Sequence, residues 1–123
     1  MLLYLMKKLN LIYISKNTAL NNVVSKLLSN YFKNVYTYDT KEKSLNSIEN
    51  KSINVVIIDL VSKDFDNEDW EEYILKLNEL NIPVYIYKKD TDSLSEECKF
   101  KVLELPVSFT NIIISLQKDL ILN

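Results

Sequence analysis

The segment Ile53–Leu60 constrains the fold more than any other part of the chain. It reads Ile-Asn-Val-Val-Ile-Ile-Asp-Leu, a short apolar and β-branched run that contains a single carboxylate, Asp59. A run of this length and composition is typical of a strand buried on both faces, as the central strands of parallel sheets are. Asp59 would then lie at the carboxyl end of a central strand, where open α/β sheets hold their functional residues.

Other strands and helices alternate around this segment. Four further β-prone segments are Leu9–Ile14, Val35–Tyr38, Ile82–Tyr87 and Lys101–Leu105, the last stopped by Pro106. Apolar residues at helical spacing predict four helices between or after these strands. The first contains Leu20, Val23, Val24, Leu27, Leu28 and Tyr31, and the second contains Leu45 and Ile48. The third contains Trp70, Tyr73, Ile74, Leu77 and Leu80, and the fourth contains Phe109, Ile112, Ile113, Leu116 and Leu120. Asn17 or Thr18 is expected to cap the first, and Asp39 or Thr40 the second. Residues 88–99 are polar and poorly periodic, so a helix there should be short or irregular.

This order predicts one α/β domain over residues 1–123. The expected fold is a (βα)₅ doubly wound, parallel five-stranded sheet with helices on both faces. With 47% apolar residues in 123, the chain is long enough to bury a core. We found no linker, repeat or low-complexity segment that would divide it.

The composition excludes several kinds of function. The chain has no glycine, which argues against glycine-rich phosphate loops and dinucleotide fingerprints. It has no histidine, so histidine acid–base chemistry and the commonest metal ligand are missing. The net charge of −2 gives no reason to expect nucleic acid or an anionic membrane as a partner. The single cysteine, Cys98, indicates a reducing cytoplasm.

The amino terminus is apolar only over Met1–Met6, before Lys7 and Lys8. This stretch is too short for a signal peptide or a membrane span. Translation could start at Met1 or at Met6. In the second case residues 1–5 are an extension that lengthens the first strand or packs on a neighbour.

The element order, together with Asp59 and Pro106, resembles the response-regulator receiver domain, the CheY-like family. The resemblance covers nearly everything from Met6 onward. In that family the aspartate that ends the third strand accepts a phosphoryl group from a histidine kinase. The resemblance therefore makes Asp59 the candidate phosphoacceptor, and it implies a signalling protein that is not an enzyme.

The chain departs from the family at most other site positions. The family's acidic pair after the first strand, which holds Mg²⁺, corresponds to Ser15 and Lys16, so Mg²⁺ binding is not expected. The family's serine or threonine after the fourth strand corresponds to Lys88. The family's lysine before the proline, which pairs with the phosphoryl group, corresponds to Leu105. The aromatic position of the fifth strand corresponds to Val102, and the usual Pro-Gly loop is replaced by residues 61–64. With these departures the chain resembles a degenerate, pseudo-receiver domain, and no cofactor is expected.

Two interpretations of the lysines follow. Lys16 or Lys88 could pair with Asp59 and replace the metal with a fixed internal cation. Alternatively, both could point into solvent, where an exposed ion pair is worth only about 0.2–1 kcal/mol.

Two other segments have some features of ligand sites. The acidic loop at residues 64–69 is dense in carboxylates but lacks the glycine and final glutamate of a calcium loop, so we interpret it as helix-capping. The hydroxyl-bearing segment Ser15–Ala19 resembles the phosphate loop of flavodoxins, which makes a small flavodoxin-like cofactor-binding protein a third reading. A colourless purified protein would exclude bound flavin.

The last predicted helix, Phe109 to Leu120, carries more apolar surface than one core needs, because Ile114 and Ile121 lie off its buried stripe. We therefore expect a receiver-like module that binds a protein partner in signalling, through this helix or as a homodimer. The alternative is a single-domain response regulator phosphorylated at Asp59 in a two-component phosphorelay.

Overall fold

The computed structural model describes residues 6–60, 70–87, 94, 96–103 and 109–116. Its elements are β1 (Asn10–Ile14), α2 (Thr18–Leu28), β2 (Asn34–Tyr38), α3 (Lys41–Asn50), β3 (Val55–Asp59), α4 (Glu71–Glu79), β4 (Val84–Tyr87), β5 (Lys101–Val102) and α5 (Phe109–Leu116). The predicted alternation of strands and helices is confirmed. None of the described helices is long and apolar enough to cross a membrane.

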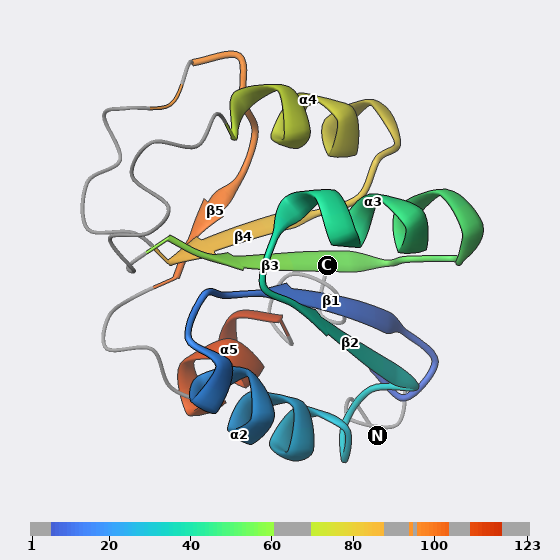
Figure 1. Ribbon diagram of the computed structural model, residues 1–123, viewed down its shortest axis with the longest axis vertical. Coiled ribbons are helices and arrows are strands. Elements are labelled where there is room, and N and C mark those ends of the chain that lie inside the picture. The colour runs from blue at the N-terminus through green and yellow to red at the C-terminus, as the bar shows by residue number, and fades with distance from the viewer. Residues whose placement is uncertain (1–5, 61–69, 88–93, 95, 104–108, 117–123) are drawn as a thin grey trace.

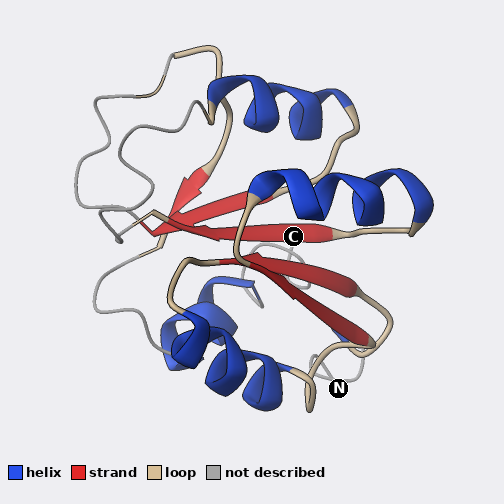
Figure 2. Ribbon diagram, viewed as in Figure 1, coloured by secondary structure: helices blue, strands red, loops and turns tan. Residues whose placement is uncertain are grey.

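All five strands form one parallel sheet in the order β2-β1-β3-β4-β5. Helices α3 and α4 cover one face, and α2 and α5 cover the other (Figures 1 and 2). This arrangement confirms the predicted doubly wound α/β fold. Asparagines at the amino ends of the strands fix part of the register, since Asn10 N–H donates to Asn54 Oδ1 at 2.7 Å and Asn34 Nδ2 donates to Asn10 Oδ1 at 3.0 Å.

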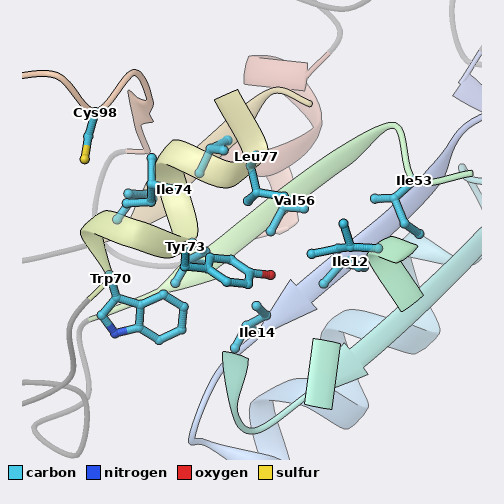
Figure 3. Packing of buried hydrophobic residues seen from close by; sticks show 13 residues of the cluster. Ile12, Ile14, Ile53, Val56, Trp70, Tyr73, Ile74, Leu77 and Cys98 are labelled. Atoms are coloured by element: carbon cyan, nitrogen blue, oxygen red, sulfur yellow. The ribbon is translucent and has the colours of Figure 1, made fainter. Parts of the chain in front are cut away.

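The sheet is buried on both faces, as the composition of its central strand predicts. Every residue of β3 is buried. Toward α3 and α4, the aromatic rings of Trp70 and Tyr73 meet edge to face, with centroids 5.5 Å apart, and pack with Ile12, Ile14 and other aliphatic side chains (Figure 3). The opposite core, under α2 and α5, contains Met6, Leu11, Tyr13, Val24, Leu28, Phe32, Val55, Ile57, Tyr85, Tyr87, Leu103 and Leu116.

The helix caps follow the sequence prediction. Asn17 is the N-cap of α2, and its side chain accepts a hydrogen bond from Leu20 N–H at 3.0 Å. Thr40 is the N-cap of α3, and its side chain accepts from Lys43 N–H at 3.2 Å. These short side chains satisfy backbone donors that the first helical turn leaves without partners.

The orientation of α2 differs from the prediction. Val23 and Leu27 were expected in the core, but they are 54% and 39% exposed. The buried residues of α2 are Asn21, Val24 and Leu28. Asn21 faces the sheet because its Nδ2 donates to the carbonyl oxygen of Ser15 at 2.8 Å. With Asn21, Val24 and Leu28 facing the sheet, Val23 and Leu27 lie on the outer flank of the helix.

The region around β5 also differs from the prediction. The strand was expected to reach Leu105 but is assigned over Lys101–Val102, and residues 104–108, with Leu105 and Pro106, lie outside the described residues. The described residues between β4 and β5 contain no helix. Val102 pairs in register with the buried Ile86 and yet is 51% exposed, because no described helix covers this end of the sheet. Leu80, expected on the buried stripe of α4, is exposed just past the last helical turn.

Candidate functional site

The sheet register places Ser15 beside Asp59. Ile14 of β1 is aligned with Ile58 of β3, so the next residue of each strand lies at the same carboxyl edge. Ser15 continues the alignment with β2, since its N–H donates to the Tyr38 carbonyl at 3.0 Å. Both side chains point to the α2–α5 face, because side chains alternate along a strand and Asp59 is two residues from Ile57 of that core.

Asp59 is a buried carboxylate held by a hydroxyl group. Asp59 is only 3% exposed, and Ser15 Oγ donates a hydrogen bond of 2.8 Å to its Oδ2. On the other side, Asp59 is aligned with Tyr87 of β4, and the following residue, Leu60, donates its N–H to the Tyr87 carbonyl at 2.6 Å. The candidate phosphoacceptor therefore lies where the sequence predicts, at the end of the central strand.

The loop after β1 fixes the Ser15 hydroxyl. Asn17 N–H donates to Ser15 Oγ at 3.1 Å, which leaves the hydroxyl proton directed at Asp59. Asn21 Nδ2 holds the Ser15 carbonyl, as described above. Asn21 was not among the predicted site residues. The signal in the sequence is that one amide stands among the apolar residues on the face of α2 that packs against the sheet. A polar group in such a position needs a specific partner.

A buried tyrosine lies close to this carboxylate. Tyr13 lies two residues before Ser15 on the same face and is fully buried. Its hydroxyl has no hydrogen-bond partner in the part of the chain that the structure describes. Burial raises the pKa of Tyr13 well above its usual range, and the charges of Asp59 and Tyr87 raise this pKa further. A neutral tyrosine hydroxyl is therefore buried close to Asp59.

Replacing Tyr13 by phenylalanine is expected to increase the free energy of unfolding by about 1 kcal/mol. The substitution removes a buried hydroxyl that pays a desolvation cost without a partner, and it keeps the ring. Urea unfolding at pH 7 measures the change. Tyr85→Phe, at a neighbouring buried position of the same face, is the matched control. A loss of stability in Tyr13→Phe alone would show that its hydroxyl has a stabilising partner.

The other predicted site residues are placed as follows. Lys16 is half-buried directly after Ser15. Hydrogen bonding to Lys43, with Nζ and Oδ1 2.8 Å apart, lowers the pKa of Asp39, and the charge of Lys16 also contributes to lowering it. Lys88 and Leu105 lie outside the described residues. The ion pair between Asp59 and Lys16 or Lys88 remains a prediction.

The donor set beside Asp59 is a poor match for a divalent cation. Mg²⁺ is held by carboxylates in near-octahedral geometry. The residues at the positions of the family's acidic pair are a neutral hydroxyl, whose proton is directed at Asp59, and a lysine. Among the described residues, no group of three His, Cys, Asp or Glu side chains is arranged to hold a metal ion.

Known structures share this architecture. No protein-family model and no curated protein matches the sequence. The chain is similar in structure to a CheY-like receiver domain protein from Methanospirillum hungatei JF-1, with a TM-score of 0.70, 14% identity, and coverage of 91% of this chain and 93% of that one. For a receiver domain protein from Clostridium thermocellum the TM-score is 0.71, with 19% identity and coverage of 90% and 93%. For the Francisella response regulator 1452 receiver domain the TM-score is 0.68, with 18% identity and coverage of 90% of this chain and 95% of that one. The chain has the fold of the CheY-like response-regulator receiver domains.

Proposed function

We propose that this protein is an atypical receiver-like signalling domain that acts as a protein–protein interaction module without Mg²⁺-dependent phosphorylation. One observation carries the proposal: the hydroxyl of Ser15 donates to the Asp59 carboxylate in a buried site. In this arrangement a neutral side chain of the protein occupies the neighbourhood that the family uses for a metal ion.

The physical argument concerns charge. Transfer of a phosphoryl group to a carboxylate depends on positioning and on neutralisation of the charge that the donor brings. A serine hydroxyl supplies one hydrogen bond to one oxygen of Asp59 and no positive charge. The same hydrogen bond occupies one lone pair of Oδ2 and lowers the nucleophilicity of that oxygen. Both effects slow phosphorylation and favour one fixed conformation.

The alternative is a single-domain response regulator phosphorylated at Asp59. The position of Asp59 at the carboxyl end of β3 favours it, since this is the phosphoacceptor position of the fold. The two functions predict different responses to beryllofluoride, a stable mimic of the acyl phosphate, and can therefore be separated.

Titration with Mg²⁺ followed by beryllofluoride is expected to leave the NMR amide spectrum unchanged around Asp59. The reason is that neither Ser15 nor Lys16 is a suitable ligand for the cation. Trp70 fluorescence, from a buried ring at the start of α4, provides a second readout. Shifts centred on Asp59 that require both reagents would establish the phosphorylated alternative instead.

The double variant Ser15→Asp/Lys16→Asp is the matched control for this titration. It restores an acidic pair beside Asp59 and should gain a response to Mg²⁺. A variant that stays silent while an ordinary receiver domain responds would show that the two residues are not what prevents cation binding. Thermal unfolding of the double variant checks that it is folded under the conditions used.

The proposal includes a partner surface and a location. Receiver domains are signalling modules rather than enzymes, so an effect passes through contact with another protein. The last helix is the proposed contact, because α5 presents Ile114 with 58% exposure. A cytoplasmic location agrees with the single cysteine of the chain, Cys98, whose thiol is buried in the α3–α4 core.

A further inference from the structure

A hollow of about 890 Å³ opens at the amino ends of β4 and β5, beside the last turn of α4. Its walls come from the end of α4, from residues 81–85 at the start of β4, and from the segment that leads into β5. The volume is within the range of small-molecule sites, roughly 300–1,000 Å³. Asp59 lies at the opposite, carboxyl edge of the parallel sheet, so this hollow is separate from the candidate site.

The hollow lies where two neighbouring strands begin at different levels. β4 is hydrogen-bonded to β3 from the Pro83 carbonyl onward, whereas β5 is paired with β4 only from Lys101, which is aligned with Tyr85. In the same register Lys99 would lie beside Pro83, but its backbone is bound to α4 instead. Lys99 N–H donates to Asn78 Oδ1 at 2.9 Å, and Asn78 Nδ2 donates to the Lys99 carbonyl at 3.0 Å. The wedge between β4 and this segment is therefore left open.

The inner surface of the hollow is mainly apolar. Val84 is buried at its floor, and Leu75, Ile82 and Phe100 are half-buried residues that pack at the margin of the α3–α4 core. These three side chains keep part of their apolar surface in contact with water. A ligand with an apolar body would remove that surface from water, which is favourable in proportion to the area covered.

Charged side chains of both signs surround this apolar floor. Glu79 and Lys99 are exposed lining residues, and within the described part of the chain neither has an ion-pair partner. Glu97 and Lys101 add one more charge of each sign, so the four charges sum to zero. A simple anion or a simple cation would therefore meet as much repulsion as attraction. A ligand that carries one charge of each sign complements the margin better.

We propose that this hollow binds a short apolar peptide, a dipeptide or tripeptide with free termini, as a small-molecule ligand. Its side chains cover the apolar floor, its ammonium group approaches Glu79, and its carboxylate approaches Lys99. The exposed amide of Asn81, which also lines the hollow, can both donate to and accept from a peptide group. A single amino acid has the same two charges but covers less of the floor, so it should bind more weakly. The inference does not depend on the proposed function.

NMR titration with leucyl-phenylalanine to about 10 mM is expected to give saturable amide shifts in α4, β4 and the segment before β5, with a dissociation constant below about 1 mM. Glu79→Gln should weaken this dipeptide about 2–5-fold and leave its N-acetyl form unaffected. Lys99→Gln should weaken it by a similar factor and leave its carboxyl-terminal amide unaffected. Glu72→Gln and Lys26→Gln remove exposed charges that do not line the hollow, and these matched controls should bind like the parent protein.

Three results would overturn the inference: no saturable shift, shifts centred outside the hollow, or equal affinity for the dipeptide when both its ends are capped. The last would show that the hollow takes any apolar group and that the charges select nothing. Tighter binding of leucine alone would refute the proposed ligand size. Silence toward both the dipeptide and beryllofluoride would refute the ligand site and leave the proposed function standing. Saturable dipeptide binding together with a beryllofluoride response would do the reverse.

Discussion

Raising the pH from 9 to 12 is expected to destabilise the protein by about 4–5 kcal/mol. Burial raises the pKa of Tyr73 to about 12 from an ordinary value of 10.0, and it raises the pKa of Tyr13 beyond that range. In the unfolded chain both hydroxyls titrate near pH 10. The folded state therefore holds protons that the unfolded state has lost, so stability is complete below about pH 10 and decreases as the pH rises. Each tyrosine contributes about 1.4 kcal/mol per pH unit.

Urea unfolding at a series of alkaline pH values measures this loss. Tyr73→Phe and Tyr13→Phe should each remove about half of the pH dependence, and the double variant should remove most of it. Tyr36→Phe is the matched control, since Tyr36 is half-buried on the edge strand β2 and the variant keeps both core hydroxyls. If the double variant loses as much stability at alkaline pH as the parent protein, the loss comes from deprotonation of other groups, and the explanation from buried tyrosines is wrong.

Replacing Ser15 by alanine is expected to lower the free energy of unfolding by about 2–3 kcal/mol at pH 7. The substitution removes the hydroxyl that donates to Asp59 Oδ2 and leaves a buried carboxylate with one hydrogen bond fewer. Asn17 N–H loses its acceptor as well. Chemical unfolding of the parent protein and the variant measures the change, with the free energy of unfolding expected to depend equally on denaturant concentration in both.

A double-mutant cycle tests the cause of that loss. In the Asp59→Asn background the Ser15→Ala change should cost at least about 1 kcal/mol less, because the group left without a donor is then neutral. Ser29→Ala is the matched control: Ser29 Oγ also donates a short hydrogen bond, 2.6 Å to the Ser25 carbonyl, but at an exposed helix end, and its loss should change stability by less than about 0.5 kcal/mol. Equal costs in the two backgrounds would mean that Ser15 acts through the loop and not through the carboxylate.

Features set by local sequence were predictable. The caps Asn17 and Thr40 depend on backbone donors three residues away, and each was one of the two residues predicted for its cap. The burial of β3 follows from its own composition, which also placed Asp59 at a strand end. In these cases the residues that determine the structure lie within one element or its immediate neighbour.

Features set by register were not predictable. Ser15 and Asp59 are 44 positions apart, and only the alignment of β1 with β3 makes them neighbours. Ser15 was predicted only as a departure from the family, and Lys16 or Lys88 as the possible partner of Asp59. The rotation of α2 was missed for a similar reason, since a wide apolar stripe does not reveal which of its residues faces the sheet. The residues on the sheet side include an amide, Asn21, which donates to the carbonyl oxygen of Ser15 just after β1.

The shortness of β5 has a consequence for solubility. An edge strand with free backbone donors and acceptors can template pairing with other chains, and proteins limit this risk with short edges and lysine side chains. β5 is two residues long and begins with the exposed Lys101. It therefore offers too few consecutive backbone groups to seed a ladder between molecules, and its ammonium group repels a like neighbour. Over the residues that the structure describes, this brevity and this charge lower the aggregation hazard of the sheet margin.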